Sequence, residues 1–236
     1  MSQIPRIAII GAGPVGFEAA LLCVSRKVDF VWFERGNPGQ HLLMWGHLQT
    51  HAPFGKLVSK AGMEALKTAK LTEWLPPLED PATGKAWVDG YLFPLSETPE
   101  LTGKIRSGVD VIGAGRANAL REDDERDGNF ILHLRDSSGE SSIEVASVID
   151  CTGVHSQPRP MGRGGISAPG EMACRDRISY IVEDILGADR AKYAGKSIVP
   201  DRTIRVCWCP QTLKVSRAPL RRIEWFLCAD TNLRNS

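Results

Sequence analysis

The sequence lacks any apolar run that approaches the ~20 residues of a membrane helix. Its first six residues lead directly into an apolar stretch and do not have the design of a secretory signal peptide. The formal net charge is only +1, so the chain as a whole is not drawn to nucleic acid or to acidic membranes. We therefore expect a cytoplasmic protein with a small-molecule substrate and with neither nucleic acid nor a membrane as partner; a homo-oligomer is left open.

The sequence also lacks a CxxC pair, although it contains six cysteines, and this argues against a dithiol redox centre. Residues 207–209 form a Cys-Trp-Cys segment without a second pair of ligands nearby, which makes a poor zinc site. His41, His47 and His51 lie in one stretch, but no pattern places all three on one metal. We expect no metal site.

The clearest signal in the chain is a glycine motif near the N-terminus. Residues 7–10 are apolar and largely β-branched, as in a buried parallel strand, and Gly11-Ala12-Gly13-Pro14-Val15-Gly16 follows at once. Residues 17–25 have the composition of a helix, and the apolar residues 28–33 end on Glu34. This order of strand, glycine turn, helix, strand and acid predicts a dinucleotide site.

Each residue of the motif has a physical role in such a site. Gly11 permits the tight turn, Gly13 lets the backbone approach a pyrophosphate, and Gly16 lets the helix pack closely on the strand. The start of the helix offers free N–H groups and the positive end of the helix dipole to the phosphates. Glu34 can accept hydrogen bonds from an adenosine ribose and disfavours a 2′-phosphate, so FAD or NAD fits better than NADP. The alternative is a glycine turn in an α/β domain that binds no nucleotide.

The stretch that follows is unusually rich in aromatic residues and glycine. Apolar, glycine-rich loops often wrap a planar cofactor, which makes Trp45 a candidate contact. Burial of the loop under the sheet explains the same composition, and the sequence leaves both interpretations of Trp45 open. Residues 57–71 are amphipathic and predict a helix, whereas prolines and Gly84 mark residues 76–84 as an excursion of the chain.

Three later segments predict further strands. Residues 109–115 end in Gly-Ala-Gly but lack the third glycine, so we interpret them as a strand without a second phosphate site. Residues 130–147 predict an antiparallel hairpin. Residues 148–153 predict another parallel strand, with Asp150 and Gly153 at the carboxyl end that faces the ligand crevice.

Residues 177–186 predict a helix that stops at Gly187. The segment combines apolar residues with charged ones and contains neither glycine nor proline.

In this order the motifs resemble those of flavoproteins with two dinucleotide-binding domains, in particular flavin-containing monooxygenase-like and pyridine-nucleotide-dependent FAD oxidoreductases. The resemblance covers roughly residues 4–199 and is carried by residues 9–16, 33–36, 45–47, 148–153 and 193–196. It implies an α/β fold: a Rossmann-like FAD-binding domain with a parallel sheet, helices and an antiparallel β insertion. It implies FAD as cofactor and NAD(P)H as electron donor.

The residues and the resemblance together predict a set of cofactor contacts. No catalytic acid, base or nucleophile is indicated. The predicted contacts are Gly11, Gly13, Pro14, Val15, Gly16, Glu34, Arg35, Trp45, Asp150 and Gly153.

The chain departs from this family after Val199. In the family, a Tyr-Ala-Gly-Lys element like residues 193–196 leads to a second GxGxxG that holds NADPH, but no GxGxxG follows here. We expect an FAD-binding domain over residues 1–199 and a divergent basic tail over residues 200–236 in place of a second nucleotide domain. From Ser197 onward there are seven Lys or Arg and three Asp or Glu. A truncated remnant, an alternative-frame product and a genuine short cap all remain open.

Three functional hypotheses follow. The first is an FAD-binding oxidoreductase, NAD(P)H-dependent and monooxygenase-like, in which the flavin carries the redox chemistry. The second is a catalytically inert flavin- or nucleotide-binding module, or a truncated fragment that lacks the NAD(P)H site. The third is an NAD-dependent enzyme that uses the first motif for NAD, although the hairpin followed by the strand at residues 148–153 fits FAD better.

Overall fold

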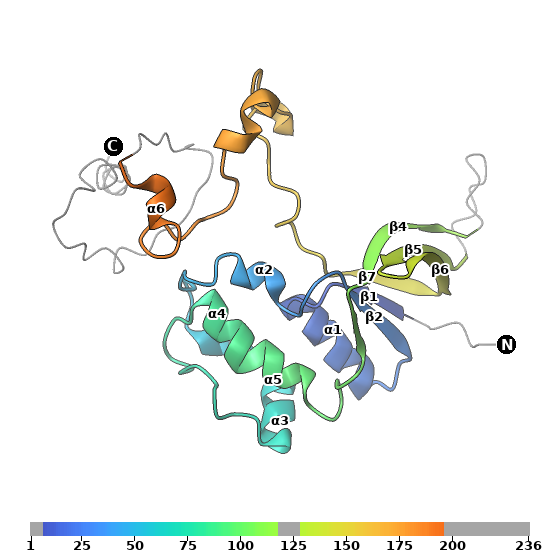
Figure 1. Cartoon of the computed structure of the whole chain (residues 1–236). Coiled ribbons are helices and arrows are strands. Elements are labelled where there is room, and N and C mark those ends of the chain that lie inside the picture. The colour runs from blue at the N-terminus through green and yellow to red at the C-terminus, as the bar shows by residue number, and fades with distance from the viewer. Residues whose placement is uncertain (1–6, 118–127, 196–236) are drawn as a thin grey trace, which may run out of the picture. The chain divides into compact units, whose positions relative to one another are not determined.

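The computed structural model describes residues 7–117 and 128–195, and it divides the chain into two compact units (Figure 1). Unit 1 runs from Met1 to Ser156 and unit 2 from Gln157 to Ser236. The predicted domain boundary at residue 199 and the tail over residues 200–236 lie outside the described residues. The elements described in unit 1 are β1 (Ile7–Ile10), α1 (Pro14–Ser25), β2 (Phe30–Glu34), α2 (Gln40–Leu43), η1 (Phe54–Lys56), α3 (Lys60–Ala69), α4 (Gly84–Trp87), η2 (Val88–Leu92), α5 (Phe93–Ser96), β3 (Ile105–Ser107), β4 (Asp110–Arg116), β5 (Phe130–Asp136), β6 (Gly139–Val145) and β7 (Ser147–Asp150).

A four-stranded parallel sheet forms the centre of unit 1, in the order β3-β2-β1-β7. Ile9 of β1 lies opposite Trp32 of β2 on one side and opposite Ile149 of β7 on the other. The predicted strands at residues 7–10, 28–33 and 148–153 are therefore confirmed and adjacent. The glycine motif leaves the sheet from β1, so it lies between the ends of β2 and β7.

A three-stranded antiparallel sheet, β4-β5-β6, covers one side of the parallel sheet (Figure 1). The hairpin predicted at residues 130–147 is confirmed as β5 and β6. Its turn is held by Asp136, whose Oδ1 accepts hydrogen bonds from the N–H and the hydroxyl of Ser138. The segment predicted at residues 109–115 is confirmed as a strand, β4, which pairs antiparallel with β5. The predicted α/β fold with an antiparallel insertion is thereby confirmed.

Successive residues of the parallel strands face two different cores, because side chains alternate across a strand. Ala8 and Phe33 are fully buried on the side of the antiparallel sheet. Ile9 and Trp32 are fully buried on the side of the helices. Burial of each large apolar side chain contributes about 1.5–3 kcal/mol, so both sides anchor the strands.

The helices gather on the other side of the parallel sheet (Figure 1). The amphipathic helix predicted at residues 57–71 is confirmed as α3, and its N-cap is Ser59, whose hydroxyl accepts a hydrogen bond from the N–H of Gly62. The α1 helix starts at Pro14, three residues earlier than the predicted segment at residues 17–25.

One helical segment was not predicted. The elements α4, η2 and α5 follow one another without a break, and η2 is a π-helical turn. Its glycines lower helix propensity, but they serve close packing: a Cβ on Gly84 would lie 2.7 Å from the Leu42 carbonyl oxygen, and one on Gly90 would lie 2.3 Å from the Trp74 carbonyl oxygen. Tertiary contacts thus decide the structure of a segment that begins at Gly84, where the predicted excursion ends.

Unit 2 has short helical turns, and its described elements are η3 (Arg163–Gly165), η4 (Met172–Arg177) and α6 (Arg190–Tyr193). The helix predicted at residues 177–186 is wrong, because η4 ends where that helix should begin. Local polar contacts compete with the helix here. Asp184 accepts hydrogen bonds from the N–H groups of Gly187 and Ala188, and the Tyr180 hydroxyl donates to the buried carboxylate of Glu171 at 2.6 Å.

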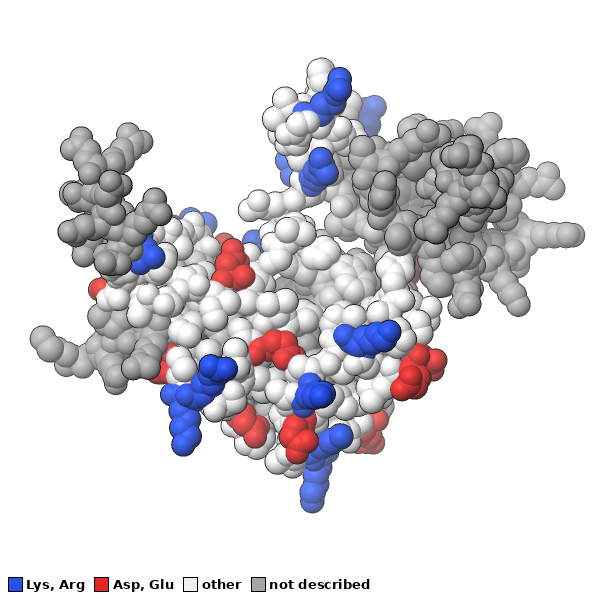
Figure 2. Space-filling model, turned by 180° about the vertical axis from the view of Figure 1, so that it is seen from behind, with Lys and Arg blue, Asp and Glu red and all other residues white. Residues whose placement is uncertain are grey.

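Within the described ranges, no helix combines the length and the apolar character that crossing a membrane requires. In the lower part of Figure 2, basic and acidic side chains are interspersed on the face that is shown. That face therefore has no broad area of a single charge sign.

The helical core makes a first prediction. Leu66 of α3 is fully buried, whereas Leu22 of α1 is 54% exposed. We expect Leu66→Ala to lower the free energy of unfolding by about 2–5 kcal/mol through lost burial and a cavity. The control Leu22→Ala should change it by about 0.5 kcal/mol or less. Urea denaturation followed by circular dichroism measures both, and equal effects of the two changes would contradict this placement of α3.

Candidate functional site

Three strand ends meet at Gly11. Its N–H donates to the Phe33 carbonyl at 2.7 Å, and the Cys151 N–H donates to the Ile10 carbonyl at 2.8 Å. The Gly11 φ angle is +99°, and a Cβ there would lie 2.7 Å from the Cys151 carbonyl oxygen. Only glycine satisfies both conditions without strain. The tight turn predicted at Gly11 is therefore confirmed, with the backbone after β7 as its packing partner.

The Gly11 carbonyl is enclosed from the side of the helices. It accepts a hydrogen bond of 3.0 Å from the indole Nε1 of Trp32. A Cβ on Gly16 would lie 2.0 Å from the same oxygen, so the close packing predicted for Gly16 is confirmed. Phe17 meets the Trp32 ring edge-on, with centroids 5.0 Å apart. The turn is thus fixed at both its N–H and its carbonyl.

Sequence reasoning missed the role of Trp32 and treated it as one residue of an apolar strand. Trp32 is fully buried. A buried indole N–H needs a hydrogen-bond acceptor. A tryptophan in a strand of otherwise aliphatic and aromatic residues therefore indicates that an acceptor lies nearby in the fold. Which acceptor it finds depends on the fold, because Gly11 belongs to another segment of the chain.

Open space lies beside Gly13. A Cβ there would meet nothing within 4 Å. Gly13 is the N-cap of α1 and has no side-chain cap. Among the residues that the structure describes, none accepts a hydrogen bond from the N–H of Gly13, Val15 or Gly16. These donors and the positive end of the α1 dipole lie at the start of the helix, an environment that favours an anion.

Glu34 lies against the same turn. Its Oε2 accepts a hydrogen bond of 2.7 Å from the Ala12 N–H, and its Oε1 accepts one of 2.8 Å from the Gly36 N–H. Each carboxylate oxygen has a second lone pair, so Glu34 can still accept hydrogen bonds from hydroxyl groups. Arg35 follows on the surface. The predicted contact between Glu34 and a ribose stays a prediction, and the structure adds a role in holding the glycine turn.

The last residue of β7 and the residues that follow it lie on the other side of the glycine turn. The Oδ1 of Asp150 accepts hydrogen bonds from the Thr152 hydroxyl at 2.6 Å and from the Thr152 N–H at 2.9 Å. These bonds, the hydroxyl's first, lower the pKa of the Asp150 carboxyl and favour its charged form. Gly153 has a φ of +68°, and a Cβ there would meet nothing within 4 Å. This backbone is open to a neighbouring group, while the predicted contacts of Asp150 and Gly153 with a cofactor stay predictions.

Trp45 packs on α4. It is half-buried against the core on the side of the helices, and its ring lies 2.9 Å from where a Cβ on Gly84 would be. Burial against α4 therefore accounts for this tryptophan, while its contact with a cofactor stays a prediction. Gly11, Gly13, Gly16 and Glu34 are the predicted residues that the structure brings together at the turn; Pro14 and Val15 extend from it as the first residues of α1.

The described residues contain no group of three or more His, Cys, Asp or Glu that could hold a metal ion. His47 and His51 are exposed. The Cys-Trp-Cys segment at residues 207–209 lies outside the described part of the chain.

No protein-family model and no curated protein matches the sequence. Solved structures do resemble the fold. The bacillithiol disulfide reductase YpdA from Bacillus cereus is 16% identical, with a TM-score of 0.52 over 72% of this chain and 44% of that one. The likeness establishes the fold.

Two further solved structures are similar at lower scores. The YpdA reductase from Staphylococcus aureus is 17% identical, with a TM-score of 0.46 over 66% of this chain and 40% of that one. An ornithine N-hydroxylase from Kutzneria sp., solved with reduced FAD, NADP⁺ and ornithine, is 14% identical, with a TM-score of 0.45 over 64% of this chain and 38% of that one. The chain spans less than half the length of each of these three structures.

The two glycines of the turn make a matched prediction. We expect Gly11→Ala to lower the free energy of unfolding by about 2 kcal/mol or more, because it forces an alanine into a strained φ and against the backbone after β7. Gly13→Ser places a favoured N-cap residue into open space and should change stability by about 0.5 kcal/mol or less. Thermal and urea unfolding of both variants measure this, and a stable Gly11→Ala protein would argue against the described turn.

Proposed function

We propose that this chain binds FAD at the glycine turn. The observation that carries the proposal is the open space beside Gly13 at the start of α1, where N–H donors have no acceptor among the described residues and where Glu34 is bound to the adjacent Ala12 N–H. The N–H groups of Gly13, Val15 and Gly16 would hold the diphosphate, because oriented donors at a helix start stabilise negative charge. Glu34 would accept hydrogen bonds from the adenosine ribose.

Glu34 also supports the choice of dinucleotide. Its carboxylate is already fixed by the Ala12 and Gly36 N–H groups. A 2′-phosphate at the ribose would place a second anion beside it, which disfavours NADP at this turn.

The order of the strands supports FAD over NAD. The chain leaves the parallel sheet after β3, builds the antiparallel sheet β4-β5-β6, and returns with β7 beside β1. The return brings Asp150 and Gly153 to the border of the site that the glycine turn begins. An NAD dehydrogenase does not usually return to its cofactor site in this way.

As activity we propose an NAD(P)H-dependent, monooxygenase-like oxidoreduction of a small-molecule substrate. FAD, when bound, would supply the redox chemistry, and the chain would supply binding, orientation and exclusion of water. The fold and the motif resemblance together support this proposed activity. The chain covers 44% of the Bacillus cereus reductase, so activity of the whole enzyme is a proposal that goes beyond the fold.

The FAD site is tested by Gly13→Asp. An aspartate is a favourable N-cap for α1, so the protein should stay folded, but its side chain and charge would occupy the space assigned to the diphosphate. We expect the purified variant to lose its flavin absorbance and its FAD affinity to fall at least ~100-fold, since charge repulsion and a blocked approach each cost more than 1.4 kcal/mol. The Gly13→Asp protein with full yellow colour would remove the assignment, provided that circular dichroism shows the same fold.

A catalytically inert module that binds flavin or another nucleotide is the second candidate. The two differ in the fate of bound FAD when NADH or NADPH is added without oxygen. We expect the flavin absorbance near 450 nm to bleach with at least one nicotinamide, because the proposed activity transfers a hydride from NADH or NADPH to the flavin. Dithionite serves as control because it reduces any accessible flavin. Bleaching by dithionite alone would favour the inert module.

A further inference from the structure

Two histidines from distant parts of the sequence meet beside the glycine turn. His41 is the second residue of α2, and the residue before α2, Gly39, donates its N–H to the Ala12 carbonyl at 2.8 Å. His155 follows Gly153 by two residues. The two imidazole rings have centroids 5.8 Å apart and planes inclined at 44°. The pair thus joins the segment after β2, which is hydrogen-bonded to the glycine turn, to the segment after β7.

The charged and titratable groups that act on His41 come from the elements around it. Glu34 ends β2, Arg35 follows it, and His155 lies beyond β7. Burial is the largest influence and lowers the pKa of His41; His155 and Arg35 lower it as well, while Glu34 raises it. The lowered pKa favours neutral His41 at neutral pH in the protein without ligand, so the imidazole retains the capacity to take up a proton when an anion arrives.

We propose that His41 and His155 form an imidazole clamp on the diphosphate of the bound dinucleotide, and that binding is coupled to uptake of a proton by this clamp. The proposal rests on the proposed function, because it uses the same cofactor. It gives roles to two side chains that the glycine motif does not include.

The physical basis is charge. The N–H donors at the start of α1 are neutral groups, and neither the glycine turn nor Glu34 supplies a positive charge to a diphosphate. A protonated imidazole donates a charge-assisted hydrogen bond, which is roughly twice as strong as a neutral one. Histidine is the side chain that can gain this charge between pH 5 and 8.

The sign of the pH dependence follows from linkage. The diphosphate favours the protonated imidazole, so the pKa of His41 is higher in the complex than in the free protein. The complex then holds more protons than the free protein, and affinity rises as the pH falls from the pKa of the complex to that of the free protein. One coupled proton allows at most about a tenfold change in affinity per pH unit.

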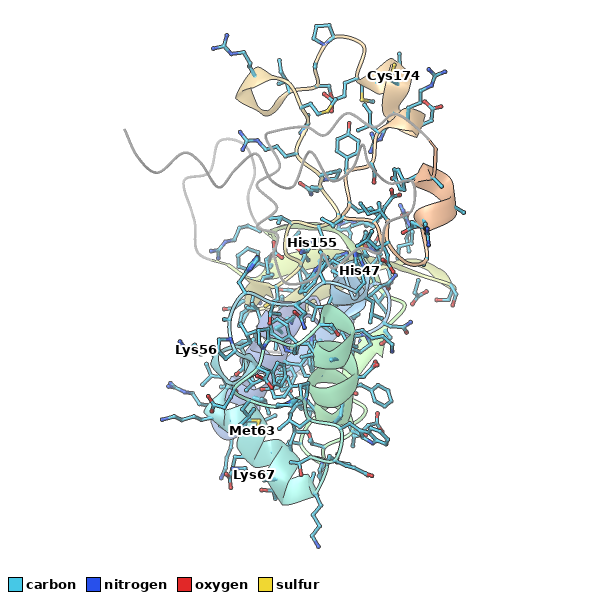
Figure 3. All side chains as sticks on the ribbon, turned by 90° about the vertical axis from the view of Figure 1, so that its left-hand side faces the viewer. His47, Lys56, Met63, Lys67, His155 and Cys174 are labelled. Atoms are coloured by element: carbon cyan, nitrogen blue, oxygen red, sulfur yellow. The ribbon has the colours of Figure 1, made fainter. Side chains whose placement is uncertain are left out.

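The test uses the full chain and FAD, whose diphosphate has no protonation step between pH 5.5 and 8.5. Flavin fluorescence titrations across this range should give a Kd that tightens about 3- to 10-fold between pH 8 and pH 6. His41→Gln and His155→Gln should each flatten this dependence and weaken binding at pH 6. His47→Gln is the matched control, because His47 is an exposed histidine of the neighbouring stretch (Figure 3), and it should keep the wild-type profile.

Calorimetry gives a second measurement, the number of protons taken up on binding, which would not change if the two histidines had only a structural role. Titration of FAD into the protein in two buffers of different ionisation enthalpy measures the protons taken up on binding. The wild-type protein should take up a fraction of one proton near pH 7, and the His41→Gln variant close to none. Riboflavin, which lacks the diphosphate, should bind without proton uptake or not at all.

The outcomes separate this inference from the proposed function. Wild-type protein that binds FAD with the same Kd at every pH and without proton uptake would overturn the clamp and leave the FAD site intact. The same holds if both glutamine variants match the wild type. A chain that binds no FAD at any pH would overturn both proposals.

Discussion

The rest of unit 1 depends on the close approach of the Gly11 peptide to its neighbours. Its N–H is bonded to the end of β2, its carbonyl to the Trp32 indole, and its α-carbon packs on the backbone that follows β7. A side chain has no room at this point, and neither does one at Gly16 of the adjoining helix. The ends of three strands and the start of α1 are therefore fixed by backbone contacts, by one buried indole and by the Glu34 carboxylate that accepts the Ala12 N–H.

The alternation of side chains along β1 and β2 explains how this arrangement is kept rigid. Trp32 anchors β2 among the helices, and its neighbour Phe33 anchors it in the core beneath the antiparallel sheet. The indole that supports the glycine turn is itself held by Phe17 of α1. A strand that is buried on both sides cannot slip by one residue without exchanging these two cores, so the turn keeps its place relative to Glu34 and to β7.

The site combines a rigid base with titratable borders. Neutral N–H donors lie at the start of α1 beside the open space at Gly13, and the Glu34 carboxylate is fixed on the adjacent Ala12 N–H. The two histidines come from the segments that follow β2 and β7, and the pKa of His41 is set by its burial and by the charges beside it. In the proposed clamp, these connecting segments provide the pH response, whereas the glycine motif provides the shape of the site.

The sequence by itself determined the features whose causes are local: the glycine turn with its strand and helix, the amphipathic α3, and the β5–β6 hairpin. Their periodicity and turn residues lie within a few positions of each other, so composition is sufficient to predict them. Only the tertiary structure decided what depends on distant partners. It placed β7 beside β1, and it paired Trp32 with Gly11 and His41 with His155. It formed a helical segment from α4 to α5 around tightly packed glycines. At residues 177–186 it replaced the expected helix by local contacts of Asp184. Long-range packing overrides weak local preferences at these places, because the burial that it adds exceeds the few tenths of a kilocalorie per residue that propensity contributes.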